Sequence, residues 1–132
     1  MKLIINTDGG ARGNPGPGAI GIVIKNEQGE KVLEVGRYIG VCTNNDAEYQ
    51  ALIAGLLGAQ DKEGTELICY LDSELVVKQL NGAYKVKEAR MKEYFKKVKE
   101  LESEFESVSY IHIERTKNKE ADAIVNQVLD SA

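Results

Sequence analysis

The sequence predicts an α/β fold in which helices flank a five-stranded mixed sheet. Three apolar segments follow one another through short links between residues 2 and 39, which is typical of an antiparallel meander. The apolar spacing then becomes helical, and two later strand-like segments alternate with helical ones. Because β-α-β crossovers are right-handed, we expect the fourth and fifth strands to run parallel to the first in one sheet.

The first forty residues contain the three expected strands of the meander. Residues 2–8 form the first strand, and residues 9–18, which are rich in glycine and proline, are expected to form a tight loop. Residues 19–25 and 31–39 are the second and third strands. A turn at residues 26–29 joins them into a hairpin.

The middle of the chain alternates helix and strand. Asn45 or Asp46 is expected to cap a helix that runs to about residue 60. Residues 67–71 are continuously apolar, as in a strand that is buried on both faces. Ser73 can then cap a short helix.

The last third contains a long helix, a strand and a final helix. The long helix is expected over residues 88–105 and the fifth strand over residues 108–113. Asn118 is expected to cap the final helix. The apolar stripe of that helix consists of Ala121, Ile124, Val125, Val128 and Leu129.

Four acids, Asp8, Glu48, Asp72 and Asp122, stand where an expected strand ends or a helix begins. The ends of parallel strands form the usual ligand crevice of an open α/β sheet. Carboxylates held close together raise each other's pKa, and bound cations offset that repulsion. Oxygen ligands of this kind suit Mg²⁺ or Mn²⁺. The four acids therefore predict two-metal phosphoryl chemistry, provided that they meet.

Each acid also has a structural interpretation. Asp8 precedes two glycines and is typical of a turn, whereas Asp72 can cap the following helix. Asp122 is an acid in a first helical turn, where the helix dipole favours it. Glu48 is harder to explain in this way, because it lies on the packing face of its helix and loses hydration there. Four such positions together favour a functional site.

Composition is that of one globular domain over residues 1–132, with 42% hydrophobic and 29% charged residues. The sequence has no apolar run of transmembrane length, so no membrane partner is expected. The apolar start of the chain is too short for a signal peptide. Cys42 and Cys69 are far apart and lack the spacing of metal ligands, which indicates reduced thiols and a cytoplasmic location.

The charge of the chain is unevenly distributed. The formal net charge is −4, and the four acids alone account for that amount. Residues 85–99 hold seven basic and two acidic residues, a local net charge of +5. This segment is either a handle for nucleic acid or a solvated helix with Glu–Lys pairs. Charge alone favours the solvated helix.

The glycine-rich segment, residues 9–18, fits neither common phosphate-binding motif. No Gly-Lys-Ser/Thr follows, which excludes a Walker loop, and the next element is a strand, which argues against a dinucleotide fingerprint. The segment is either a plain hairpin loop or a close approach to a ligand. Arg12 and Asn14 within it can reach a phosphate or a ribose.

Around the four acids and in the glycine-rich segment, the chain resembles the type 1 ribonuclease H family. The matching segments are residues 7–18 (TDGGARGNPGPG), 43–49 (TNNDAEY), 71–73 (LDS) and 118–122 (NKEAD). The resemblance implies a ribonuclease H-like fold and an endonuclease that hydrolyses the RNA strand of RNA–DNA hybrids. It implies two Mg²⁺ ions, with Mn²⁺ as an alternative, and products with 5′-phosphate and 3′-hydroxyl ends. The implied catalytic residues and metal ligands are Asp8, Glu48, Asp72 and Asp122.

The resemblance also implies contacts with the hybrid substrate. The implied contacts with the RNA minor groove are Gly13, Asn14, Asn44 and Asn45. Thr43 is implied to bind a DNA phosphate. Ser73 and Arg115 complete the expected substrate-binding residues. A monomer is expected.

The chain departs from many family members in two ways. It is a short form without the loop histidine, because its only histidine, His112, falls in the expected fifth strand. It has no tryptophan and lacks the basic, Trp-rich protrusion, so only residues 84–99 could take that role.

Three other functions are compatible with parts of the pattern. A four-acid 3′–5′ exonuclease would place two acids two residues apart on the first strand, and here Asp8 is alone. A non-catalytic hybrid-binding module would not need four intact acids. A nuclease that also cleaves RNA–RNA duplexes stays open on sequence alone.

Overall fold

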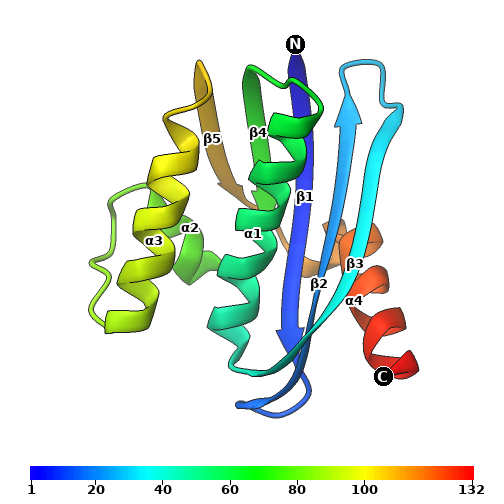
Figure 1. Ribbon diagram of the computed structural model, residues 1–132, viewed down its shortest axis with the longest axis vertical. Coiled ribbons are helices and arrows are strands. Elements are labelled where there is room, and N and C mark those ends of the chain that lie inside the picture. The colour runs from blue at the N-terminus through cyan, green and yellow to red at the C-terminus, as the bar shows by residue number, and fades with distance from the viewer.

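The computed structural model describes residues 1–132 and contains one five-stranded sheet with helices on both faces (Figure 1). The expected fold class and the order of the nine expected elements are confirmed, and a short 3-10 helix, η1, is added before the last helix. The strands are β1 (Lys2–Ala11), β2 (Gly16–Asn26), β3 (Lys31–Cys42), β4 (Glu66–Leu71) and β5 (Ser107–His112). The helices are α1 (Asn44–Asp61), α2 (Glu74–Leu80), α3 (Ala89–Glu102), η1 (Arg115–Lys117) and α4 (Lys119–Ser131).

The strand order is β3-β2-β1-β4-β5. β1, β2 and β3 pair antiparallel as a meander, and β4 and β5 run parallel to β1, as the sequence predicts. The parallel pairing of β1 with β4 ends at Thr7 and Leu71. The next residue of the chain is an acid in both cases: Asp8, still on β1, and Asp72, directly after β4.

Successive side chains of β2 point to opposite faces of the sheet, so they contribute to two separate apolar clusters. Ile20, Ile22 and Ile24 belong to the large core that α1 covers, whereas Ala19 belongs to the small cluster under α4. Figure 1 shows α1 and α3 side by side on one face and α4 on the other. None of the helices is long and apolar enough to cross a lipid bilayer.

The expected buried fourth strand is less covered than its sequence indicates. Leu67, Cys69 and Leu71 are buried, but Ile68 and Tyr70 on the other face are only half-buried. α4 packs chiefly over the meander strands, so it leaves that face of β4 partly open.

The glycine-rich segment is mostly strand, and the prediction of a loop over residues 9–18 was wrong. β1 continues to Ala11, β2 begins at Gly16, and only residues 12–15 connect them. The glycines occur in the strands because other parts of the chain approach closely. A Cβ atom on Gly9 would overlap the backbone carbonyl of Ala47 in α1, so glycine allows α1 to lie directly on β1.

The N-cap of α1 is Thr43, which precedes the predicted Asn45 or Asp46. Thr43 Oγ1 accepts a hydrogen bond of 3.1 Å from the Asp46 amide, and Asp46 Oδ2 accepts one of 2.9 Å from the Thr43 amide. This reciprocal arrangement is a capping box with aspartate at its third position. The predicted cap of α2 by Ser73 is confirmed.

Candidate active site

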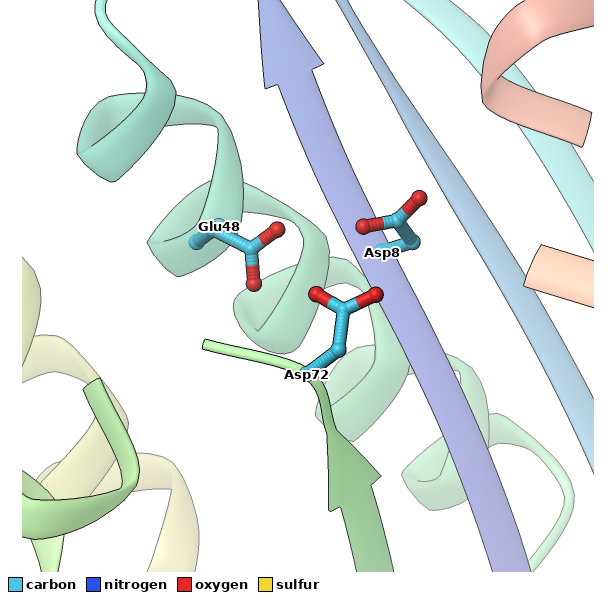
Figure 2. Close-up of side chains that lie close together, drawn as sticks. All are labelled: Asp8, Glu48 and Asp72. Atoms are coloured by element: carbon cyan, nitrogen blue, oxygen red, sulfur yellow. The ribbon is translucent and has the colours of Figure 1, made fainter. Parts of the chain in front are cut away.

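Three elements bring three acids together at one edge of the sheet. Asp8 lies on β1, Asp72 directly follows β4, and Glu48 lies in the second turn of α1. Figure 2 shows the three carboxylates pointing toward one another from these elements. One oxygen from each lies within 4.8 Å of the others, so the group has the geometry to hold a metal ion. The sequence predicted this convergence.

The environment of these acids opposes their ionisation. Burial, and then the charge of Asp72, raises the pKa of Asp8 from 3.8 to about 7. Burial, and then the charge of Asp8, raises the pKa of Glu48 well above its ordinary value. Without a cation, the site therefore binds protons that isolated carboxyl groups would release.

The close approach of α1 to β1 that requires glycine at position 9 also fixes the Glu48 side chain. The Gly9 amide donates a hydrogen bond of 3.0 Å to Glu48 Oε1. Glu48 Oε2 is buried and has no hydrogen-bond partner. An unpartnered carboxylate oxygen beside two other carboxylates is the donor set that a hard divalent cation prefers. The residues present thus fit Mg²⁺ or Mn²⁺.

The fourth predicted acid, Asp122, lines the same surface cavity as the other three acids but lies outside their close group. It sits in the first turn of α4, and its charge contributes to the raised pKa of Asp8. Arg115 Nη2 donates a hydrogen bond of 3.1 Å to its Oδ1. Asn126, one turn further along α4, donates a hydrogen bond of 3.1 Å to the Asp122 backbone carbonyl.

Asn118 has a larger role than the predicted helix cap. Its side chain makes no capping bond and is buried. Its Nδ2 donates to the Thr7 carbonyl at 2.8 Å and to Asp72 Oδ2 at 3.4 Å, and its Oδ1 accepts from Asn6 at 3.0 Å. Asn118 therefore ties α4 to both acid-bearing strands. Sequence reasoning missed this role, because Asn before a helix ordinarily caps it.

A cavity of about 450 Å³ opens above the acids. The predicted site residues that line it are Asp8, Glu48, Asp72, Asp122, Asn44, Asn45, Ser73 and Arg115. Gly13, Asn14 and Thr43 do not line it. Arg12 and Asn126 line it as well; Asn126 could have been found from its spacing of four residues from Asp122.

The predicted minor-groove residues also hold two segments together. The Asn44 amide donates to Asn14 Oδ1 at 3.0 Å, and the Ala11 amide donates to Asn44 Oδ1 at 2.9 Å. The β1–β2 connection and the start of α1 therefore form one bonded rim beside the cavity.

The basic segment, residues 85–99, is not uniformly free. Lys99 donates to the Leu80 carbonyl at 3.0 Å, and the Arg90 side chain pairs with Asp46 at 2.8 Å. Lys85, Lys87 and Lys92 are exposed and make no ion pair. Arg90 and Lys99 therefore have partners within the protein, and the interpretation of the segment as a nucleic-acid handle stays a prediction.

His112 lies in β5, as predicted, opposite Leu71 of β4. It is exposed and does not line the cavity. The only cationic side chains at the cavity are Arg12 and Arg115.

One family model and several curated proteins match this chain over most of its length. A family model described as reverse transcriptase-like matches residues 6–128. A bifunctional protein of Mycobacterium tuberculosis is 41% identical over 133 residues, which cover 100% of this chain and 36% of that protein. Ribonuclease HI of Halobacterium salinarum is 42% identical over 125 residues, which cover 95% of this chain and 63% of that enzyme. The chain thus spans between about a third and two thirds of these curated relatives.

Solved structures match the whole fold. The crystal structure of RNase H1 from Halobacterium salinarum has a TM-score of 0.97 at 40% identity and covers 100% of both chains. LC11-RNase H1, solved in complex with an RNA/DNA hybrid, has a TM-score of 0.93 at 46% identity, with 98% of this chain and 97% of that chain covered.

Proposed function

The chain belongs to the type 1 ribonuclease H family, and we propose that it hydrolyses the RNA strand of RNA–DNA hybrids. The observation that carries this proposal is the group formed by Asp8, Glu48 and Asp72, whose ligand oxygens lie within 4.8 Å of one another. The relative LC11-RNase H1, solved in complex with an RNA/DNA hybrid, supports the choice of substrate. The products would carry 5′-phosphate and 3′-hydroxyl ends.

Asp8, Glu48, Asp72 and Asp122 would hold two divalent cations, Mg²⁺ or alternatively Mn²⁺. When bound, these ions supply positive charge that stabilises the charge developing on the scissile phosphate. Two observations support cation binding. Glu48 Oε2 has no partner, and a cation would supply one. The pKa of Asp8 is raised, and a cation would favour the ionised form of its carboxyl group.

Asn44 and Asn45 at the rim of the cavity would contact the RNA strand. The side-chain oxygen of Asn44 already accepts from the Ala11 amide, so its NH₂ group is left to donate to a 2′-hydroxyl. A 2′-hydroxyl is what distinguishes RNA from DNA at such a contact. Gly13 and Asn14 would contact the same groove from the β1–β2 connection.

Two hydroxyl groups would contact phosphates. Thr43 Oγ1 accepts from the Asp46 amide, and Ser73 Oγ accepts from the Val76 amide. Each hydroxyl hydrogen is therefore free to donate to a phosphate oxygen. Arg115 has further N–H groups beyond the one that bonds Asp122, and these would donate to the scissile phosphate.

We further propose that residues 1–132, whose strands form one five-stranded sheet, are a single domain that acts as a monomer. The test compares end-labelled RNA–DNA, RNA–RNA and DNA–DNA duplexes of one sequence in Mg²⁺ on a denaturing gel. Cleavage of the RNA–DNA hybrid alone supports the proposal. Equal cleavage of RNA–RNA would extend the substrate class, and efficient cleavage of DNA–DNA would contradict recognition through the 2′-hydroxyl.

A further inference from the structure

Asp46 is a buried carboxylate that connects the start of α1 with α3. It is 3% exposed and lies in the first turn of α1, directly after Asn44 and Asn45. Its Oδ2 accepts the Thr43 amide at 2.9 Å, while its Oδ1 lies 2.8 Å from Nε of Arg90 in α3. The Arg90 contact is an ion pair and not an aligned hydrogen bond, because Oδ1 has no hydrogen-bond partner. A buried carboxylate in this position depends on its cation.

The ion pair connects to both segments that form the rim of the cavity. Asp46 fixes Thr43 through the capping box, and the next residue, Asn44, bonds Asn14 and Ala11 at 3.0 and 2.9 Å. A continuous set of contacts therefore runs from Arg90 through α1 to the β1–β2 connection. None of these contacts involves a residue of the acid group.

Helix packing fixes where Arg90 stands. α1 and α3 lie side by side with their first turns at the end of the molecule where β1 ends (Figure 1). One turn beyond the ion pair on both helices, Gln50 Nε2 donates to the Tyr94 hydroxyl at 3.1 Å. The rings of Tyr49 and Tyr94 stack with centroids 5.8 Å apart and planes 13° apart. This packed interface places α3 so that the Arg90 side chain, which is 55% exposed, lies beside the buried Asp46 carboxylate.

We propose that Arg90 is a positioning residue for substrate binding, which acts through Asp46 to hold Thr43, Asn44 and Asn45 against the hybrid. This inference rests on the proposed ribonuclease H function. The alternative is that Arg90 contacts a phosphate directly, as a basic residue of a nucleic-acid handle. The two roles differ in what Asp46 does. If Arg90 is a positioning residue, Asp46 is the group through which it acts. If Arg90 contacts a phosphate, Asp46 competes with that phosphate for the guanidinium.

The variants Arg90→Ala, Asp46→Asn and the double variant separate the two roles. If Arg90 positions the rim, each single variant raises the KM for the hybrid roughly fivefold, and the double variant raises it no further, because both changes remove one interaction. The kcat stays near the wild-type value, since the acid group is untouched. Arg90→Lys restores part of the affinity. The matched control is Lys97→Ala, which removes one charge from an exposed position of the same helix.

Salt dependence and nuclear magnetic resonance complete the test. A positioning role leaves the slope of log KM against log salt unchanged in Arg90→Ala, whereas a phosphate contact lowers it by about one unit. Asp46→Asn would leave or tighten binding if Arg90 contacted phosphate. In ¹H–¹⁵N spectra without substrate, Arg90→Ala is expected to shift the amides of Thr43 and Ala11, and Lys97→Ala is not.

The outcomes also separate this inference from the proposed function. Unshifted Thr43 and Ala11 amides in Arg90→Ala overturn the positioning role, whether or not the enzyme is active. The positioning role is also overturned if Arg90→Ala and Asp46→Asn both cleave the hybrid at the wild-type rate with an unchanged KM. Wild-type protein that fails to cleave any hybrid contradicts the proposed function instead, and the amide shifts still decide the role of Arg90.

Discussion

The guanidinium of Arg115 donates a hydrogen bond of 3.1 Å to Oδ1 of Asp122. Arg115 follows β5 in the short helix η1, and its side chain is 74% exposed beside the cavity. It is therefore a cation placed against one of the four acids without any part in the core. The only histidine of the chain has no comparable position.

Replacement of Arg115 by alanine is expected to lower kcat roughly tenfold, because the scissile phosphate then lacks a charge-assisted hydrogen bond. The melting temperature is expected to stay the same, since the side chain is exposed. His112→Ala serves as the matched control and is expected to change kcat only slightly. A large loss in His112→Ala together with no loss in Arg115→Ala would reverse these roles.

Asp72→Asn is expected to abolish detectable cleavage of the hybrid while the fold stays intact. The amide keeps the shape of the side chain but lacks the charge that a cation needs. The variant is also expected to melt at a higher temperature than wild type in EDTA, since Asp72 is one of the charges that raise the pKa of Asp8. The control is Asp61→Asn at the far end of α1. A rate within about tenfold of wild type would exclude Asp72 as a ligand.

The metal-free protein is expected to lose stability as the pH rises from about 4 to about 7. The pKa of Asp8 is 3.8 in the unfolded chain and about 7 in the fold, so the folded state binds more protons between these values. The stability that protonated Asp8 contributes is fully present below pH 3.8. It is lost as the pH rises through the folded-state pKa of about 7. Melting temperatures in EDTA at pH 5 and pH 8 measure the loss.

Addition of Mg²⁺ is expected to raise the melting temperature more at pH 8 than at pH 5, because cations and protons compete for the same carboxylates. Asp8→Asn is expected to flatten the pH dependence in EDTA. If Asp8→Asn loses as much stability as wild type between the two pH values, the effect arises elsewhere in the protein.

Three exposed lysines in the first part of the basic segment, Lys85, Lys87 and Lys92, are expected to bind phosphates. Combined replacement of Lys85, Lys87 and Lys92 by glutamine is expected to weaken hybrid binding similarly for all sequences. The slope of log affinity against log salt is expected to fall by roughly one unit for each lysine–phosphate pair that the replacement removes. Lys62→Gln, at the far end of α1, is the control. An unchanged slope would favour a solvated helix without a binding role.

The acids could be located from the sequence because each stands where a local pattern changes. The apolar run of β4 ends at Leu71, so Asp72 had to lie at a strand end, and Glu48 was conspicuous as an acid on a packing face. Element order and the handedness of crossovers then placed β4 beside β1. These arguments need no knowledge of distant contacts.

The remaining features depend on partners that are far away in sequence. The glycines of β1 and β2 are typical of a loop, although Gly9 is required by the approach of Ala47. The Arg90–Asp46 pair joins residues of two helices, and the side chain of Asn118 bonds Thr7 and Asp72. In each case the neighbouring residues in sequence favour a local role: a loop for the glycines, a solvated cation for Arg90 and a helix cap for Asn118. Tertiary contacts override these local preferences.

The most direct measurement of the function is the cleavage of an internally mapped RNA–DNA hybrid by the wild-type chain, with Mg²⁺ and with EDTA. We predict internal cuts in the RNA strand in Mg²⁺, products with 5′-phosphate and 3′-hydroxyl ends, and no cuts in EDTA. Loss of cleavage in Asp72→Asn under the same conditions assigns the activity to this site. Cuts that persist in EDTA, or an RNA strand left intact in Mg²⁺ by folded protein, would contradict a metal-dependent ribonuclease H.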